Sequence, residues 1–349
     1  MELEIQEVED DREALLFAIG CLWGGCREAA AHRLSSVTEG MRTMSKIVRN
    51  LKEPRNAGLA VALAATCLGL FYLLAAAAPA RYLTVNAAAF LLGAVALFGF
   101  AGAGIRAIRF TGLLVLALAA SLLATALFGA SAEGASRWIR IGPLGVQLSL
   151  VVLPLMILLY ARNPDRIGTA GIVVAAAALA LQPDRGMAGV LTLATGVLLL
   201  ARRERSSAIA FAAALGAFAA TMLRPDALPA SPYVDRILFT AFEIHVGAGA
   251  AVLLGAAILP IPALVGWRYD PPARSVYAVF AAVWIGCILA AILGNYPTPV
   301  VGYGGSAILG YLLSLAPFRA EVLGKAACPG FEAAEEREAG PLPRSALAA

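Results

Sequence analysis

Charged residues are scarce in this sequence. Asp, Glu, Lys and Arg make up 14% of its 349 residues, whereas a soluble domain contains about 25%. Hydrophobic residues account for 60%, and the mean hydropathy is +0.79. The composition excludes a soluble globular protein and indicates a polytopic membrane protein. The net charge of +4 does not indicate nucleic-acid binding, because the cations lie in short loops and in the N-terminal segment, as membrane orientation requires.

Metal ligands are also scarce. The sequence contains two histidines and five scattered cysteines. Cys21 and Cys26 have no second pair at zinc-site spacing, and Cys67 and Cys287 lie inside apolar runs, where cysteine behaves as a small hydrophobic residue. These residues predict no metal or haem site and no defined cofactor. A divalent cation is left open.

Long apolar runs dominate the sequence from Ala57 onward. A helix needs about 20 apolar residues to cross a bilayer. The runs predict ten spans, at residues 57–79, 82–105, 108–130, 145–161, 167–182, 186–201, 207–223, 236–260, 274–294 and 302–317. We therefore predict an all-α integral membrane protein with about ten transmembrane helices. Residues 56–318 form its transmembrane domain, residues 1–55 a tail with an amphipathic helix, and residues 319–349 a disordered tail.

Basic residues set the expected orientation. Eight Lys or Arg residues precede the first span, and the loops assigned to the inner side hold nine, against six in the outer loops. Because Lys and Arg favour the cytoplasmic side, both termini are predicted to be cytoplasmic. Four distinctive loops then lie on the outer side, namely GASRWIRIGPLGVQLS (134–149), LQPDRGMAG (181–189), RPDALPASPYVDR (224–236) and NYPTPVVGYGGS (295–306). They predict a site built as a cleft on one face of the protein.

Glycines mark the last of these loops. Gly302, Gly304 and Gly305 lie in VGYGGSAIL, and each glycine costs about 1 kcal/mol relative to alanine inside a helix. The backbone there is expected to bend or to approach another group closely. Non-helical backbone at membrane depth persists only where protein buries it or where it lines a wet cavity.

Acidic residues near the outer ends of the spans are candidate functional groups. Asp184 and Asp235 lie in outer loops, and Glu243 would lie about two turns into the span 236–260. An ionisable residue inside a span is a functional candidate. The alternatives are a helix cap for Asp235 and a hydrogen bond within the bundle for Glu243. We interpret His245, two residues further on, as structural.

Arginines give the outer loops a basic character. Guanidinium groups match phosphate oxygens in bidentate fashion. A basic outer cleft with one carboxylate suits an anionic lipid head group, and it suits an anion pathway equally. The residues that form this basic set are Arg137, Arg140, Arg185, Arg224 and Arg236.

Motifs in the four outer loops resemble those of the SEDS proteins, the FtsW/RodA/SpoVE group of cell-division and cell-shape membrane proteins. GASRWIRIGPLGVQLS is similar to the family's G-x-x-RWI-x-x-G…QPSE block, and LQPDRGMAG to its QPD-x-G-T stretch. LPASPYVDRILFTAFE is similar to its LP-x-x-x-TDFIF…E segment, and PVVGYGGSAIL to its LPF-x-SYGGSS signature. The motifs occur in the family's order, and the resemblance covers about residues 60–317.

The resemblance implies peptidoglycan glycosyltransfer on a lipid-linked disaccharide-peptide precursor in a bacterial plasma membrane, with a class B transpeptidase as partner. Asp235 would be the general base that takes the proton of the acceptor hydroxyl, and Arg236 beside it is expected to keep it ionised. Membrane lipids are expected contacts, and nucleic acid is not. The residues assigned to substrate binding are Arg137, Arg140, Gln147, Asp184, Arg185, Arg236, Glu243, Tyr303, Gly304, Gly305 and Ser306.

The sequence also departs from the family pattern. Leu150 and Leu153 stand where the family has Glu and Lys, and the outer loop Leu223–Arg236 is short. These departures leave two alternatives open. One is a degenerate relative that binds the precursor or a division partner without polymerising it. The other is a lipid or anion transporter, although a transporter should contain inverted repeats with broken helices, and no such pairing is evident in the sequence.

Overall fold

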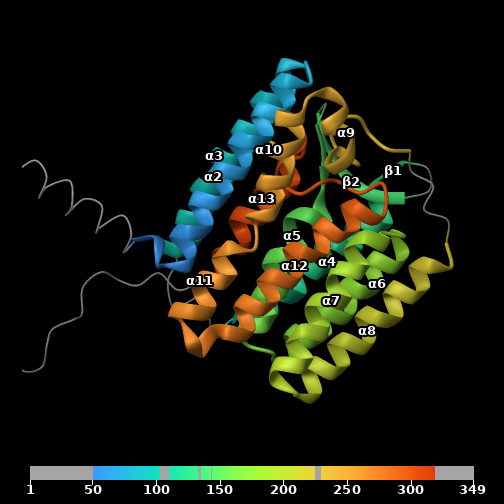
Figure 1. The fold of residues 1–349 in the computed structure, drawn as a ribbon. Helices are drawn as coiled ribbons and strands as arrows, with labels where there is room; N and C mark the ends of the chain where they lie inside the picture. The colour runs from blue at the N-terminus through green and yellow to red at the C-terminus, as the bar shows by residue number, and fades with distance from the viewer. Residues whose placement is uncertain (1–49, 103–109, 133–134, 143, 225–228, 319–349) are drawn as a thin grey trace, which may run out of the picture.

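A computed structural model describes residues 50–102, 110–132, 135–142, 144–224 and 229–318. The amphipathic helix predicted in the N-terminal tail and the predicted tail 319–349 lie outside these residues. Most of the described chain is helical (Figure 1). The helices are α2 (Pro54–Ala75), α3 (Ala80–Gly102), α4 (Thr111–Phe128), α5 (Leu148–Arg162), α6 (Arg166–Leu181), α7 (Arg185–Arg202), α8 (Arg205–Met222), α9 (Ile237–Ile244), α10 (Val246–Ala257), α11 (Ile261–Tyr269), the 3-10 turn η2 (Pro271–Ala273), α12 (Arg274–Leu293) and α13 (Gly305–Ser314).

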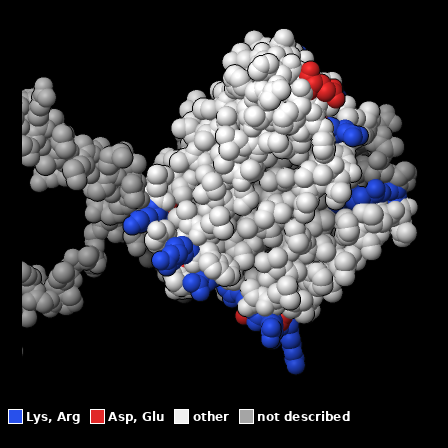
Figure 2. All heavy atoms as spheres, viewed as in Figure 1, with Lys and Arg blue, Asp and Glu red and all other residues white. Residues whose placement is uncertain are grey.

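Seven helical segments of the described chain are long and apolar enough to cross a bilayer. Three shorter apolar helices, α5, α6 and α13, correspond to the remaining predicted spans. The all-α membrane fold with about ten spans is confirmed. In Figure 2 the charged side chains lie near the margins of the drawn face, and a broad uncharged surface separates them, as contact with lipid requires.

The predicted span 236–260 is wrong in its boundaries. The chain instead forms two helices, α9 and α10, which are separated by His245 in an extended conformation (φ −165°, ψ 141°). The imidazole of His245 caps α10, because its Nδ1 accepts a hydrogen bond from the Gly247 N–H at 2.9 Å. The spanning segment runs from Val246 to Tyr269 through α10 and α11. Glu243 therefore lies at the end of a short separate helix, where it is exposed.

The helices form two groups, which are joined by α13 and by a contact between α11 and α12. Helices α2 and α3 pack against each other, α2 also contacts α10 and α11, and α10 contacts α9. In the second group α4 packs against α5 and α6, and α7 packs against α8 and α12 (Figure 1). Helix α13 contacts α3 and α2 on one side and α5 on the other. The contact with α5 needs glycine, since a Cβ on Gly310 would overlap the carbonyl oxygen of Leu150.

A small antiparallel sheet lies at one end of the bundle. Its strands are β1 (Ala130–Ala132), β2 (Ala135–Ile141) and β3 (Leu144–Gln147), in the order β1-β2-β3. Strands β2 and β3 form a tight hairpin with Trp138 opposite Gln147 and Ile141 opposite Leu144. Gly142 in the turn has a positive φ of 58°, which favours glycine. The motif predicted as an outer loop is thus a hairpin that leads directly into α5.

Candidate functional site

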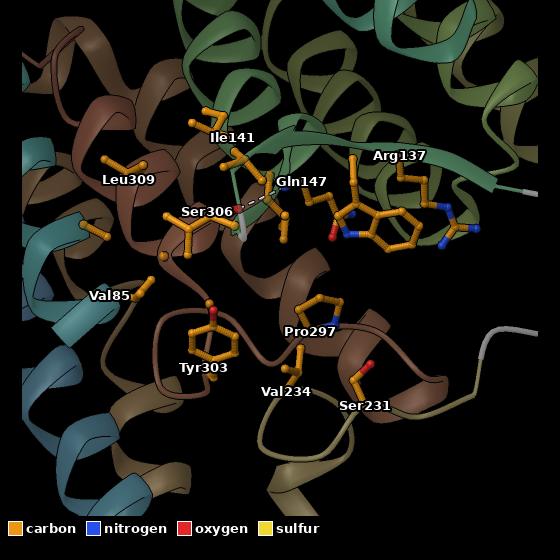
Figure 3. Close-up of a pocket in the computed structure, with 18 of the residues that line it drawn as sticks. Val85, Arg137, Ile141, Gln147, Ser231, Val234, Pro297, Tyr303, Ser306 and Leu309 are labelled. Carbon is orange, nitrogen blue, oxygen red and sulfur yellow. Dashed lines mark hydrogen bonds between the residues drawn. The ribbon is translucent and has the colours of Figure 1, made fainter. Parts of the chain in front are cut away.

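The four predicted outer loops come together at the hairpin end of the bundle. The hairpin, the segment 229–235 and the segment 295–306 line a cavity of about 960 Å³, and α3 closes one side (Figure 3). The turn 182–184 lies behind the hairpin and binds it. Apolar residues of the lining include Val85, Ala88, Ala89, Leu92, Ile141, Leu144, Leu150 and Leu309. Polar and charged residues of the lining include Arg137, Arg140, Gln147, Ser231, Asp235, Asn295, Tyr296, Tyr303 and Ser306.

Arg137 anchors the hairpin to the bundle. Its side chain is 3% exposed, and its guanidinium donates to the carbonyl oxygens of Gln182, at 3.4 Å, and of Pro183. Gln182 is the C-cap of α6, and a cation is favourable at a helix C-terminus. In Figure 3 the guanidinium points away from the middle of the cavity. Arg137 therefore holds the cavity wall in place.

Asp184 supports the same wall from behind. It is completely buried and caps α7 through the Met187 N–H at 3.2 Å. Its Oδ2 also accepts from Ser149 Oγ at 2.9 Å and from Gln147 Nε2 at 3.3 Å. Asp184 thus fixes the end of β3 and the start of α5, and it is not among the lining residues.

Gln147 connects the hairpin to α13. Its backbone N–H donates to Ser306 Oγ at 3.1 Å, the dashed line in Figure 3. Ser306 follows the first residue of α13, and both residues line the cavity. Two segments separated by 159 residues therefore form one continuous wall.

Asp235 is the carboxylate of the cavity lining. It is partly buried, and its Oδ2 accepts from the Ser231 N–H at 2.7 Å. Burial raises its pKa above the ordinary value of 3.8, and the Ser231 hydrogen bond opposes that rise. Arg236, which was expected to keep Asp235 ionised, is not among the causes of this shift. Arg236 is exposed with a left-handed backbone (φ 59°), and the described residues contain no ion pair between it and Asp235.

The glycine-rich turn lies against neighbouring backbone and helix, as expected. A Cβ on Gly302 would lie 2.9 Å from the Tyr233 carbonyl oxygen, and one on Gly305 would lie 3.1 Å from the Ala89 Cβ. Gly304 has open space around it and an extended φ of −172°. Tyr303, between them, lines the cavity, and its N–H donates to the Tyr233 carbonyl at 2.7 Å.

The remaining predicted residues differ in position. Arg140 is exposed and lines the cavity from β2. Arg185, Arg236 and Glu243 are not lining residues. The guanidinium of Arg185 instead donates to the carbonyl oxygens of Thr221, at 3.4 Å, and Arg224, at 3.0 Å, near the end of α8.

The two leucines that depart from the family pattern lie in different places. Leu150 lines the cavity and is 4% exposed, whereas Leu153 is completely buried in the bundle core. Among the described residues, no group of three His, Cys, Asp or Glu side chains comes together in a way that could hold a metal ion. The charged residues of the lining are Asp235, Arg137 and Arg140, and the guanidinium of Arg137 is bound to backbone carbonyls.

Sequence reasoning missed several site residues. Asn86 and Tyr82 on α3 contact the glycine-rich turn, and Asn295 and Tyr296 line the cavity. For Asn86 a signal was present, because it is an amide inside a predicted apolar span, and polar groups there need a partner. For Tyr82 the sequence gives only an aromatic residue at a span end, which is common at membrane interfaces.

Comparison with solved structures identifies the fold. The rod shape determining protein RodA of Thermus thermophilus matches with a TM-score of 0.54 and 22% sequence identity, covering 74% of this chain and 93% of RodA. A mutant of the same protein matches with a TM-score of 0.55, 21% identity and coverages of 74% and 94%. A chain from a structure described as a peptidoglycan synthase complex that coordinates polymerization and crosslinking matches with a TM-score of 0.54, 19% identity and coverages of 74% and 95%.

No protein-family model and no curated protein matches the sequence. The structural matches nevertheless span nearly the whole length of the RodA chains. The chain therefore has the RodA fold of SEDS proteins, and the resemblance noted in its four motifs is confirmed at the level of the fold.

Proposed function

We propose that this protein is a peptidoglycan glycosyltransferase that polymerises a lipid-linked disaccharide-peptide precursor. The observation that carries the proposal is the placement of Asp235, a partly buried carboxylate that lines a cavity of about 960 Å³ on a RodA fold. The cavity lining combines apolar residues, among them Val85, Leu92 and Leu309, with polar and charged residues. A lipid-linked sugar, which has an apolar tail and a polar head, matches that combination.

Asp235 is suited to act as a general base. An acceptor sugar hydroxyl would attack the anomeric carbon of the donor, forming a new C–O bond while the bond from that carbon to the pyrophosphate oxygen breaks. The carboxylate takes the proton of the attacking hydroxyl, and lipid pyrophosphate leaves. Because burial raises the pKa of Asp235, the carboxylate is a stronger base than an exposed aspartate, and a base works best when its pKa lies near the working pH.

Arg140 is suited to stabilise the leaving group. It is exposed on the cavity side of β2, whereas the guanidinium of Arg137 is buried against backbone carbonyls. Negative charge develops on the pyrophosphate as the glycosidic bond breaks, and a cation aimed at that charge lowers the barrier. Asp235 and Arg140 thus supply a base and a cation from two loops of one cavity.

A transpeptidase partner, an outer-face cavity and a plasma-membrane location with cytoplasmic termini belong to the same proposal. The partner is supported by the third structural match, which is named for a complex that coordinates polymerization and crosslinking. The orientation is supported by the basic loops at the opposite end of the bundle.

Polymerisation of purified lipid-linked precursor, with wild type and Asp235→Asn, tests the proposal. We expect glycan chains from the wild type and none from the variant. Leu150 is an apolar lining residue where the family pattern has Glu, and this departure favours a second candidate, a protein that binds the precursor without polymerising it. Precursor binding by a wild type that forms no glycan, with and without a transpeptidase, would support that candidate instead.

A further inference from the structure

One face of α3 holds the glycine-rich turn. Tyr82, Asn86, Ala89 and Gly93 lie at intervals of four, three and four residues, which places them on the same side of the helix. Ala89 lies against Gly305, and Gly93 lies against Leu312 of α13. The two residues nearest the start of α3, Tyr82 and Asn86, contact the turn itself.

Asn86 satisfies two backbone groups of the turn at once. It is completely buried, its Nδ2 donates to the Gly302 carbonyl at 2.9 Å, and its Oδ1 accepts from the Gly304 N–H at 3.2 Å. The amide must donate to a carbonyl and accept from an N–H, so only one orientation of the side chain fits. The Gly302 carbonyl and the Gly304 N–H lie in non-helical chain and would otherwise need another hydrogen-bond partner at membrane depth. Asn86 supplies that partner.

Tyr82 holds the ring of Tyr303. The two rings stack with centroids 3.8 Å apart and an interplanar angle of 13°, and Tyr82 also packs edge-on against Tyr233 at 5.9 Å. In Figure 3 the Tyr303 hydroxyl points into the cavity on the side of Ser306. A phenolic hydroxyl can both donate and accept a hydrogen bond, so Tyr303 offers the cavity both functions.

The backbone around this turn needs such support. Val300, a buried β-branched residue, has a φ of 69°, and Tyr233 has a φ of 63°. A positive φ is costly for β-branched and bulky residues and persists only where the surroundings hold it. Hydrogen bonds from Tyr303 N to Tyr233 O and from Thr298 N to Val234 O tie the two segments together, and Asn86 ties them to α3.

We propose that Asn86 and Tyr82 are positioning residues that set Tyr303 and Ser306 in the cavity wall for binding of the lipid-linked donor. Neither residue is part of the lining, so both act through the turn. This inference rests on the proposed function, because it assigns the wall at Tyr303 and Ser306 to that substrate. Its first test is nevertheless independent of catalysis.

The first test measures the contact between α3 and the turn. The ideal Cβ of Gly305 lies 3.1 Å from the Ala89 Cβ, within a few tenths of an ångström of the ~3.5–4.5 Å found in disulfides. In full-length protein without its native cysteines, Ala89→Cys with Gly305→Cys should form a disulfide. We expect Asn86→Leu and Tyr82→Leu each to slow its formation at least about fivefold, and Tyr82→Phe, which keeps the ring, to leave the rate unchanged.

Thr169→Val is the matched control. It removes a buried side-chain hydrogen bond to Tyr160, 3.0 Å long, at the opposite end of the bundle, so it measures the effect of losing a polar contact elsewhere. Unchanged disulfide rates in both Asn86→Leu and Tyr82→Leu would overturn the proposal. Tyr82→Leu keeps the test decisive if Asn86→Leu fails to fold, because Tyr82 is only partly buried.

The second test measures donor use. With native cysteines present, Asn86→Leu and Tyr82→Leu should raise KM for the precursor about tenfold with a smaller change in kcat, because binding contacts are lost. The pH profile should stay that of the wild type. An unchanged KM with a fall in kcat would refute the assignment. If the wild type forms no glycan, the proposed function fails, while the disulfide rates and precursor affinities of the same variants still decide the role of Asn86 and Tyr82.

Discussion

Asp235 and Pro297 pair as an isolated antiparallel β-bridge. Next to this bridge, the Thr298 N–H donates to the Val234 carbonyl at 3.0 Å. The residue proposed as the base therefore lies where the segment 229–235 pairs with the segment 295–306, which carries the glycine-rich turn. Its position depends on backbone pairing between two loops, and the side chain is then oriented by the Ser231 N–H.

Asp235→Asn should abolish polymerisation while expression and precursor binding persist. The amide oxygen can still accept from Ser231, but an amide cannot take the acceptor proton, and a positioned base contributes about 10²–10⁴-fold. Glycan synthesis assayed on gels measures the loss. Glu243→Gln is the control, because Glu243 is exposed on α9 outside the cavity lining. Polymerisation at the wild-type rate by Asp235→Asn would exclude this residue as the base.

The pH dependence follows from the raised pKa of Asp235. The base must be ionised, so kcat/KM should fall as pH decreases through an apparent pKa above 3.8.

The raised pKa of Asp235 also makes stability depend on pH, but in the opposite direction. A carboxyl with a raised folded pKa stabilises the fold below its unfolded pKa, and that stabilisation is lost as pH rises through the folded pKa. Asp235→Asn should therefore raise Tm at neutral pH relative to wild type. An equal or lower Tm would contradict burial as the dominant cause.

Substitutions of Arg140 and Arg137 should affect different properties, the first catalysis and the second stability. Arg140→Gln should lower kcat/KM about tenfold or more, because it removes a cation near developing charge, with little change in Tm. Arg137→Gln should lower the free energy of unfolding by about 1–3 kcal/mol, because it leaves buried carbonyls without their donor. Thermal unfolding and polymerisation rates, measured on both variants, check the pair. The reverse pattern would show that their roles are exchanged.

Membrane orientation can be tested by cysteine labelling. Ser231 lines the cavity at one end of the bundle. Ser206 lies at the opposite end, in the first turn of α8, next to the connection from α7. With cytoplasmic termini, an impermeant thiol reagent applied to intact cells should label Ser231→Cys and leave Ser206→Cys unlabelled until the cells are opened. Labelling only at Ser206→Cys in intact cells would place the cavity on the cytoplasmic side and would refute its role in outer-face synthesis.

Sequence alone determined the membrane class, the approximate number of spans and the loops that form the site. These follow from local properties, since runs of apolar residues define spans and polar motifs mark the loops between them. Asp235 and Arg140 were candidates because of their charge in these loops, and Tyr303 and Ser306 because their motif resembles the SEDS signature. All four line the cavity. The break at His245 was missed because Val246 and its neighbours continue the apolar pattern of α9.

Tertiary structure decided where each candidate residue lies and what it contacts. Sequence chemistry treats Arg137 and Arg140 alike, but the pleat of β2 buries one against the end of α6 and leaves the other exposed at the cavity. Asp184 became a support behind the wall because Gln147 and Ser149 reach it across the α5 start. The role proposed for Asn86 depends on the contact of α3 with a turn 216 residues away. Hydrogen bonds between segments far apart in the sequence form only once the helices have packed. A local sequence pattern does not indicate which distant segments will meet.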